Sequence, residues 1–288
     1  MELPLHARAS RLDVGVVSAG RVGAVLGAAL ARAGHRVVAA TAVSTASRAR
    51  AAALLPGVPL LPADEVARRA GLLLLAVPDD ALADLVAGLA ETGALRPGQL
   101  VVHTSGRHGT GVLAPATAVG ALPVALHPVL PFTGTAEDRL AGVGFGITAP
   151  DLLRPIGEAL VVEVGGEPVH VREELRPLWH AALAHGANHL VTLVSSAAEL
   201  LREAGADDPA AVLAPLLHAA LDGALRRGDG ALTGPVARGD AGTVAAHLTA
   251  LPPDVRPAYA ALARLTADRA LGSGRLTADQ AAGLLAVL

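Results

Sequence analysis

The chain has 288 residues, no cysteine and a formal net charge of −3. The lack of cysteine excludes disulfides, thiolate metal ligands and cysteine nucleophiles. All 23 basic residues are arginine, which also excludes Schiff-base chemistry on a lysine. The sequence contains no cluster of arginines with interleaved aromatic residues, the pattern that would indicate a nucleic-acid-binding surface.

No apolar stretch reaches the about 18 residues of a membrane span. Residues 1–11 lack the basic and apolar regions of a signal peptide, so we expect a short disordered tail there. Together with the charge, these features predict a cytoplasmic protein without a nucleic-acid or membrane partner. A small molecule is the expected substrate.

Short apolar segments alternate with alanine-rich segments in the first half of the chain. The predicted strands are Asp13–Val17, Arg36–Ala40, Val58–Leu61, Leu72–Val77, Leu100–His103, Val124–His127, Gly144–Thr148 and a short one near Pro168–Val171. The predicted helices are Arg21–Ala33, Ala46–Leu55, Ala63–Ala70, Ala81–Thr92 and Leu152–Val162. Near-continuous apolar runs are typical of parallel strands buried on both faces, so the pattern predicts a doubly wound α/β domain.

The second half contains only helical patterns. Residues 173–204 show no convincing break, because Pro177 falls in a first helical turn, and they predict one long helix that ends before Gly205. Further helices are expected at Pro209–Arg227, Ala241–Leu251, Arg256–Ala270 and Thr277–Leu288. We therefore expect an α/β domain over residues 12–171 and an all-α domain over residues 172–288.

The first strand is followed by the turn Ser18-Ala19-Gly20-Arg21-Val22-Gly23. The turn fits the dinucleotide-binding pattern G-x-G-x-x-G except for serine at the first position. Gly20 would let the backbone approach a pyrophosphate, and Gly23 would let helix and strand pack closely. Ser18 can fill the first position if its backbone angles stay in the allowed region. This context, a strand before and a helix after, predicts a Rossmann-type domain; a glycine-rich turn without a ligand is the alternative.

The second strand is followed by a segment, residues 40–48, that lacks an acidic residue. An acid at this place would bind the ribose 2′-hydroxyl of NAD. The segment instead offers the hydroxyls of Ser44 and Ser47 and the guanidinium of Arg48, with Arg50 behind it, for a 2′-phosphate. NADP is therefore the predicted cofactor; an ordinary loop with a helix-capping serine is the alternative.

Three further strand ends carry polar residues, and ligands of open α/β sheets lie beyond such ends. The segments are Val77-Pro78-Asp79-Asp80, His103-Thr104-Ser105-Gly106 and His127-Pro128. Turn chemistry, with Asp79 or Asp80 as a helix cap, fully explains the first segment and explains the other two as well as a functional role does. As a functional hypothesis, His103 and His127 converge on a nicotinamide or substrate pocket, His127 binds substrate, and the cofactor contacts Val77, Pro78, Thr104 and Ser105.

The long helix carries four polar side chains in an apolar context, namely His180, His185, Asn188 and His189. His180 and Asn188 share a face at i and i+8, and His185 lies three residues before Asn188. No carboxylate lies on that face and no HExxH motif is present, so no metal site is predicted. We expect His180, His185 and Asn188 to be catalytic, against the alternative of buried structural histidines.

A loop between later helices reads Leu232-Thr233-Gly234-Pro235-Val236-Ala237-Arg238-Gly239-Asp240. Thr233 and Arg238 are candidate substrate-binding residues, because an arginine can hold a carboxylate with two hydrogen bonds. In the structural alternative, Thr233 or Asp240 caps a helix.

Six segments together resemble a known family: VGVVSAGRVG, VPDDAL, HTSG, ALHP, WHAALAHGANHLVTL and LTGPVARGD. The chain resembles the Rossmann-like proteins that carry domain of unknown function 2520, over residues 12–288. These proteins are similar in layout to pyrroline-5-carboxylate reductase, ketopantoate reductase and 6-phosphogluconate dehydrogenase. The resemblance implies an NADP-binding α/β domain followed by a helical domain that often forms homodimers.

The leading functional hypothesis is an NADPH-dependent reductase acting on a C=O or C=N bond of a small carboxylate, with a ketopantoate-like 2-keto acid as first candidate and a cyclic imine as second. His180 or His185 would donate the proton, Asn188 would orient the substrate, and Arg238 would hold its carboxylate. The chain departs from ketopantoate reductases and β-hydroxyacid dehydrogenases, which use a lysine as proton donor. The alternative is a sensor or scaffold that binds NADP without turnover.

Overall fold

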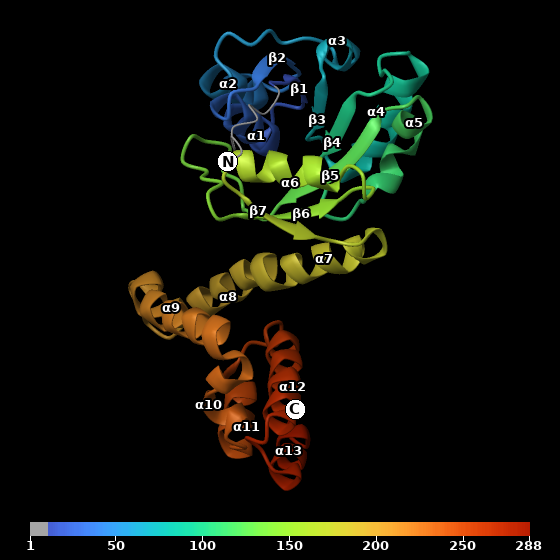
Figure 1. Ribbon diagram of the computed structural model, residues 1–288. Helices are drawn as coiled ribbons and strands as arrows, with labels where there is room; N and C mark the ends of the chain where they lie inside the picture. The colour runs from blue at the N-terminus through green and yellow to red at the C-terminus, as the bar shows by residue number, and fades with distance from the viewer. Residues whose placement is uncertain (1–10) are drawn as a thin grey trace, which may run out of the picture. The chain divides into compact units, whose positions relative to one another are not determined.

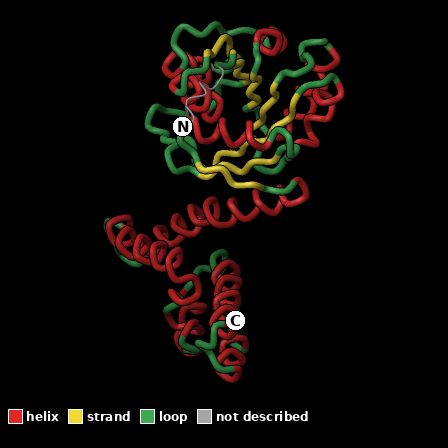
Figure 2. The backbone as a smooth tube through the Cα atoms, in the orientation of Figure 1, coloured by secondary structure: helices red, strands yellow, loops and turns green. Residues whose placement is uncertain are grey.

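The computed structural model describes residues 11–288 (Figure 1). The tail predicted at residues 1–11 lies outside the described residues except for its last one. The chain forms two compact units, which divide between Ala187 and Asn188. All strands of the described part belong to the first unit, shown in yellow in Figure 2, and the second unit is helical. The change from α/β to helical structure comes earlier, after the last strand ends at His170.

The first unit is built on a seven-stranded sheet of order β2-β1-β3-β4-β5-β6-β7. The strands are β1 (Asp13–Val17), β2 (Arg36–Ala40), β3 (Leu72–Leu75), β4 (Leu100–His103), β5 (Leu122–Pro128), β6 (Gly144–Thr148) and β7 (Glu167–His170). The first five strands are parallel to one another. In contrast, β6 runs antiparallel to β5, and β7 runs parallel to β6. The predicted Rossmann-type fold is confirmed. The apolar runs did not predict that the two strands at one edge of the sheet, β6 and β7, run in the opposite direction.

Both faces of the sheet are buried, and β3 shows why its sequence is continuously apolar. Leu72 and Leu74 pack into one core together with α1 (Arg21–Arg32) and α6 (Arg154–Glu163). Leu73 and Leu75 point to the other face, into a second core with α3 (Ala63–Arg69) and α4 (Asp79–Glu91). Successive side chains of a strand alternate between faces, so a strand covered on both sides needs apolar residues throughout.

Shorter elements complete the first unit. The helix α2 (Thr45–Leu54) packs against α1, and η1 (Thr110–Leu113) with α5 (Ala114–Ala118) packs against α4. The prediction of a strand at Val58–Leu61 is wrong: Leu60 makes only an isolated bridge to Ala40. Pro59 and Pro62 have no backbone N–H and cannot donate to a ladder, so the pairing does not extend.

The segment predicted as one long helix is helical but not uniform. It consists of η2 (Glu173–Leu175), α7 (Arg176–Leu183), a π-helical turn (Ala184–Asn188) and α8 (His189–Glu203). A π turn spaces its residues differently from an α-helix. The predicted common face of His180 and Asn188 assumed α-helical spacing across this turn and stays a prediction.

The second unit continues with α9 (Pro209–Arg227), η4 (Gly228–Ala231), α10 (Gly234–Ala237), α11 (Ala241–Ala250), α12 (Arg256–Gly272) and α13 (Ala278–Leu285). Its core is formed by α10 to α13 and includes Val236, Val244, Ala267 and Leu284. In contrast, α8 contributes no buried residue and α9 contributes few.

Candidate functional site

The turn after β1 is held in place by the end of β2. The backbone N–H of Ser18 donates to the hydroxyl of Thr41 at 2.6 Å, and the N–H of Ala19 donates to the carbonyl of Thr41 at 2.7 Å. Ser18 has a φ of 75°, in the left-handed region that glycine favours. For serine this conformation costs about 1–2 kcal/mol. Serine at the first motif position therefore strains the backbone, and the hydrogen bonds to Thr41 offset this cost.

The two glycines of the motif have the geometry that their predicted roles require. Gly20 is the N-cap of α1, no side chain caps the helix there, and a Cβ on Gly20 would have only the Ser18 hydroxyl within contact, at 3.4 Å. A Cβ on Gly23 would lie 2.1 Å from the carbonyl oxygen of Ser18, so any side chain would force the turn and helix apart. Arg21 is exposed and Val22 is half-buried. The free N–H groups of this helix end are a suitable binding surface for a phosphate.

A hollow of about 580 Å³ lies beyond the end of β2, between residues 41–43 and residues 60–63. Its only charged lining residue is Arg48, which donates from Nε to the carbonyl of Ala42 at 3.4 Å. Ser44 is the N-cap of α2 and accepts from the N–H of Ser47 at 3.1 Å, and the two hydroxyls contact each other. The capping alternative is therefore correct for Ser44, while Arg48 faces the hollow.

The end of β3 borders the turn after β1. Val77 and Pro78 follow β3; Val77 is half-buried and Pro78 is exposed. The Cβ of Ala76 lies only 2.9 Å from the place that a Cβ on Gly23 would take. Pro78 is the N-cap of α4, so neither Asp79 nor Asp80 caps that helix. Both acids instead lie in the first turn, where negative charge is favourable.

The loop after β4 folds back on itself. The hydroxyl of Ser105 accepts from the N–H of His108 at 3.1 Å, and Thr104 donates its N–H to the carbonyl of Leu75 at 3.1 Å. Thr104 is half-buried and Ser105 is buried. The Ser105 side chain is thus used within the loop, and Thr104 remains the more available of the two predicted cofactor contacts.

His103 is a structural residue, contrary to the hypothesis that it lines a pocket. It is fully buried, its Nδ1 accepts from the N–H of Ser105 at 3.2 Å, and its Nε2 lies 2.8 Å from the carbonyl of Gly109. Burial lowers the pKa of His103 to about 4. The neutral ring therefore closes the loop that follows β4.

His127 and His180 lie side by side at the carboxyl end of β5. Their ring centroids are 5.9 Å apart with an interplanar angle of 79°. The indole N–H of Trp179 donates to Nδ1 of His127 at 3.1 Å. A Cβ on Gly106 would lie 2.9 Å from Nε2 of His127 and 2.7 Å from Cδ2 of His180. The structure therefore brings together two predicted site residues from elements more than 50 residues apart and places a bare glycine between them.

Arg176 is a member of this cluster that the sequence reasoning missed. It is fully buried, and its Nη1 donates to the carbonyl of Gly146 at 3.2 Å. In the described part of the chain its Nε and Nη2 have no hydrogen-bond partner. Burial lowers its pKa to about 10, which leaves the guanidinium charged at neutral pH. Arg176, Trp179 and His180 follow the i, i+3, i+4 spacing of one helix face, a signal that was present in the sequence.

Glu173 anchors the start of this helical segment to the loop after β4. Its carboxylate accepts from the N–H groups of Thr110 at 2.7 Å and Gly111 at 2.9 Å. These hydrogen bonds, with a smaller contribution from Arg176, lower the pKa of Glu173 although burial opposes the shift. The contact connects the loop that carries Gly106 with the helix that carries Trp179.

The other predicted catalytic residues lie in the π turn. His185 and Asn188 are both exposed there, His185 in the first unit and Asn188 at the start of the second. Since the two units are described separately, the joint action of His180, His185 and Asn188 stays a prediction.

The predicted substrate-binding residues of the second unit lie on α10. Thr233 is its exposed N-cap and lines a largely apolar hollow of about 830 Å³ between α8, α11 and α12. Arg238 is exposed at the other end of α10. Asp240, the N-cap of α11, accepts from the N–H of Thr243 at 3.0 Å, so the capping alternative is correct for this residue.

Over residues 11–288, no group of three or more histidine, aspartate or glutamate side chains is placed to hold a metal ion. Within the same residues, no helix combines the length and apolar character needed to cross a bilayer.

Two family models match the chain, a Rossmann-like domain over residues 3–128 and domain of unknown function 2520 over residues 143–266. The chain therefore belongs to the Rossmann-like proteins that carry this domain, as its motifs predicted. No curated protein matches its sequence.

Solved structures share the fold along most of the chain. A Bacteroides fragilis protein, provisionally assigned as an NADP oxidoreductase, is 23% identical with a TM-score of 0.77, covering 90% of this chain and 98% of that one. Pyrroline carboxylate reductase of Plasmodium falciparum, solved with NADP bound, is 11% identical with a TM-score of 0.57, covering 95% and 98%. A Thermotoga maritima protein is 18% identical with a TM-score of 0.66, covering 90% and 99%. At these identities the likeness shows a common fold.

Proposed function

We propose that the protein is an NADPH-dependent oxidoreductase that reduces a C=O bond of a small carboxylate, with a ketopantoate-like 2-keto acid as first candidate and a cyclic imine as second. One observation carries the proposal: the open turn at Gly20 follows β1, and His127, whose ring contacts His180, lies at the end of β5, a parallel strand of the same sheet. They therefore lie at the same carboxyl edge, where open α/β sheets bind ligands. The sheet order reverses between β1 and β3, which is the expected place for a dinucleotide.

The residues fit NADP. The uncapped N-terminus of α1 with Gly20 and Gly23 would hold the pyrophosphate, because its N–H groups are free and no side chain is in the way. Arg48, facing the hollow beyond β2, would pair with the 2′-phosphate. NADPH supplies a hydride when bound. The NADP-bound reductase from Plasmodium falciparum with the same fold supports this choice of cofactor.

The side chains beside His127 would act on the substrate. His180 is half-buried beside His127, and an imidazole is a common general acid, so His180 is suited to donate the proton that the reduced oxygen takes up. His185 is the alternative donor, Asn188 would orient the substrate, and Arg238 would hold its carboxylate. The buried charge of Arg176 favours an anionic ligand at this edge of the sheet.

The cofactor assignment is tested by replacing Arg48 with alanine. We expect the Kd for NADPH, measured by calorimetry, to rise about tenfold, because a charge-assisted hydrogen bond is lost, while the Kd for NADH stays unchanged. Arg32→Ala is the matched control, since Arg32 is exposed at the opposite end of α1. An equal rise of the Kd for NADPH and for NADH in Arg48→Ala would contradict the contact with the 2′-phosphate.

The reaction is tested by following the loss of NADPH absorbance with a panel of 2-keto acids and cyclic imines. Turnover of one panel member identifies a reductase. Tight NADPH binding without any oxidation supports the sensor, which the absence of lysine favours. Single alanine variants of His180, His185 and Asn188 should keep NADPH binding. If all three also keep full turnover, their catalytic assignment is wrong.

A further inference from the structure

The hydrogen bond from Trp179 determines which nitrogen of His127 carries the proton. An indole N–H can only donate, so Nδ1 of His127, 3.1 Å away, must accept. A neutral imidazole has one proton, which then lies on Nε2. The pair therefore holds His127 as the Nε2–H tautomer.

Trp179 is itself held in position by the strand next to His127. Gly146 on β6 is the direct register partner of His127 on β5. A Cβ on Gly146 would lie 2.9–3.0 Å from the indole ring, so glycine is needed for the ring to lie there. The backbone thus fixes the donor beside the histidine that it contacts.

The other side of the His127 ring faces Gly106. A Cβ there would lie 2.9 Å from Nε2, and among the described residues none accepts a hydrogen bond from this atom. His127 and His180 are each partly exposed. The absence of a side chain at Gly106 therefore leaves the Nε2–H group open to an acceptor from outside the protein.

The surroundings keep His127 uncharged. Burial lowers its pKa to about 4, and the guanidinium of Arg176 on α7 acts in the same direction, as do the rings of His180 on α7 and His103 on β4 when they carry a proton. Asp79 on α4 opposes them. At neutral pH the ring is a neutral hydrogen-bond donor, and its buried neighbour Arg176 disfavours a second cation nearby.

We propose that His127 is the neutral donor that binds the carbonyl oxygen of the substrate, with Trp179 as its positioning residue. The inference rests on the proposed reductase function and narrows its substrate class. A ketone oxygen accepts from a neutral N–H, whereas a protonated imine has no lone pair to accept with and is repelled by Arg176. The site therefore favours 2-keto acids over cyclic imines, and the proton comes from a group other than His127.

The tautomer is tested without substrate or cofactor, by ¹⁵N NMR of the histidine rings in the full chain. Wild-type His127 should show a protonated Nε2 and an unprotonated Nδ1 from pH 6 to 8. Trp179→Phe, which keeps an aromatic ring and loses the N–H, should give a mixture of tautomers. The matched control is Tyr259→Phe, because Tyr259 contacts His247 at 2.8 Å in the second unit. A protonated Nδ1 in the wild-type protein would overturn the proposal.

The role is tested with NADPH and the 2-keto acid and imine panels. Removing one such preorganised donor typically lowers kcat about 100-fold, so we expect His127→Ala to lose about this much and His127→Gln, which offers an amide N–H, to recover part of it. Trp179→Phe should lower kcat with the Kd for NADPH unchanged.

The outcomes separate the two proposals. Turnover that is unaffected by all three variants, or that is faster with imines, overturns the donor role and leaves the reductase in place. NADPH binding without turnover of any panel member overturns the reductase and the donor role together, while the NMR result still decides the tautomer.

Discussion

Gly23 lies where α1 approaches the turn after β1, and no side chain fits there. We predict that Gly23→Ala destabilises the fold by roughly 1–3 kcal/mol and weakens NADPH binding, because its Cβ would lie 2.1 Å from a backbone oxygen. Gly88→Ala is the matched control. Gly88 is in α4, where an added Cβ would meet nothing within 4 Å, so alanine should stabilise by about 0.5–1 kcal/mol. Urea unfolding of both variants measures the difference; equal effects would contradict the steric role.

His103 makes stability depend on pH. Its folded-state pKa of about 4 lies below the ordinary value of 6.5, so the unfolded chain binds more protons between these two pH values. The stabilisation is complete above pH 6.5 and is lost as the pH falls toward 4. From pH 7.5 to 5 we expect His103 to reduce the free energy of unfolding by about 2 kcal/mol.

His127 should further reduce the free energy of unfolding as the pH falls, since its pKa is also lowered to about 4. Denaturant unfolding at several pH values measures the slope. In His103→Gln the slope between pH 7.5 and 5 should be smaller than in the wild type. A wild-type stability that is constant over this range would contradict the prediction.

At the residue level, the sequence located single positions but not their partners. Gly20 and Gly23 were identified because the glycine pattern lies between a strand and a helix, and of the two only Gly23 is required by contacts within the protein. His103 was misjudged because its acceptor, the carbonyl of Gly109, becomes a neighbour only when the loop folds back. Arg176 was missed because a charged residue in a first helical turn is usually exposed. Arg176 is buried because the folded chain packs it against Gly146 on β6.

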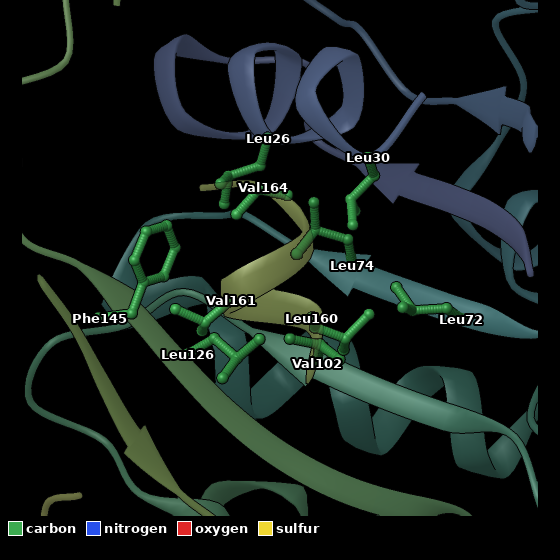
Figure 3. A pocket seen from close by; sticks show the side chains of 10 residues that line it. All are labelled: Leu26, Leu30, Leu72, Leu74, Val102, Leu126, Phe145, Leu160, Val161 and Val164. Atoms are coloured by element: carbon green, nitrogen blue, oxygen red, sulfur yellow. The ribbon is translucent and has the colours of Figure 1, made fainter. Parts of the chain in front are cut away.

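The core between the sheet, α1 and α6 contains a void of about 30 Å³ (Figure 3). It is lined only by apolar side chains, which cannot hold a water by hydrogen bonds. We predict that Val102→Ile, which adds one methylene toward this void and keeps a β-branched residue in β4, stabilises the fold by up to about 1 kcal/mol.

The matched control for the void is Val86→Ile on α4. Val86 is fully buried in the core on the other face of the sheet, and the extra methylene should there cost about 1–3 kcal/mol. Thermal unfolding of the two variants gives shifts of opposite sign if the void is real. A destabilising Val102→Ile would show that the side chains already fill this space.

At the level of elements, apolar periodicity identified most of the sheet and failed where another constraint dominated. Two prolines stopped the pairing at Val58–Leu61, and the reversal of β6 has no signature in an apolar run. The π turn at Ala184–Asn188 was not predicted, because a π turn has no apolar pattern of its own that separates it from an α-helix.

The second unit exposes large apolar side chains on α8 and α9, which we propose are covered by a second copy of the chain. Val191, Leu216 and Leu225 are 67%, 64% and 79% exposed, and apolar surface of this extent on monomers usually marks an interface. We expect light scattering to give twice the 28.7 kDa mass of one chain. Leu216→Glu should yield monomers.

Leu152→Glu is the matched control for this dimer. Leu152 is 91% exposed and lies in the first unit, away from α8 and α9 in the sequence. The variant should keep the mass of a dimer. A wild-type protein with the mass of a single chain would contradict the proposal.

For the molecule as a whole, the motifs were sufficient to predict the family and the α/β fold, since six segments spread over the chain had to agree. The chemistry was harder to predict. The pair His127–Trp179 joins a strand end to a helix 52 residues later, and only the folded sheet brings the two side chains together.

Trp179 has one more consequence, because it is the only tryptophan in the chain. All tryptophan emission of the protein therefore comes from one indole, which is partly exposed and bonded to the ring of His127. A ligand that enters beside Gly106, or a proton that reaches His127, changes the surroundings of this one fluorophore. Ligand binding at the candidate site of the wild-type protein can therefore be followed by the fluorescence of Trp179, without an added dye or label.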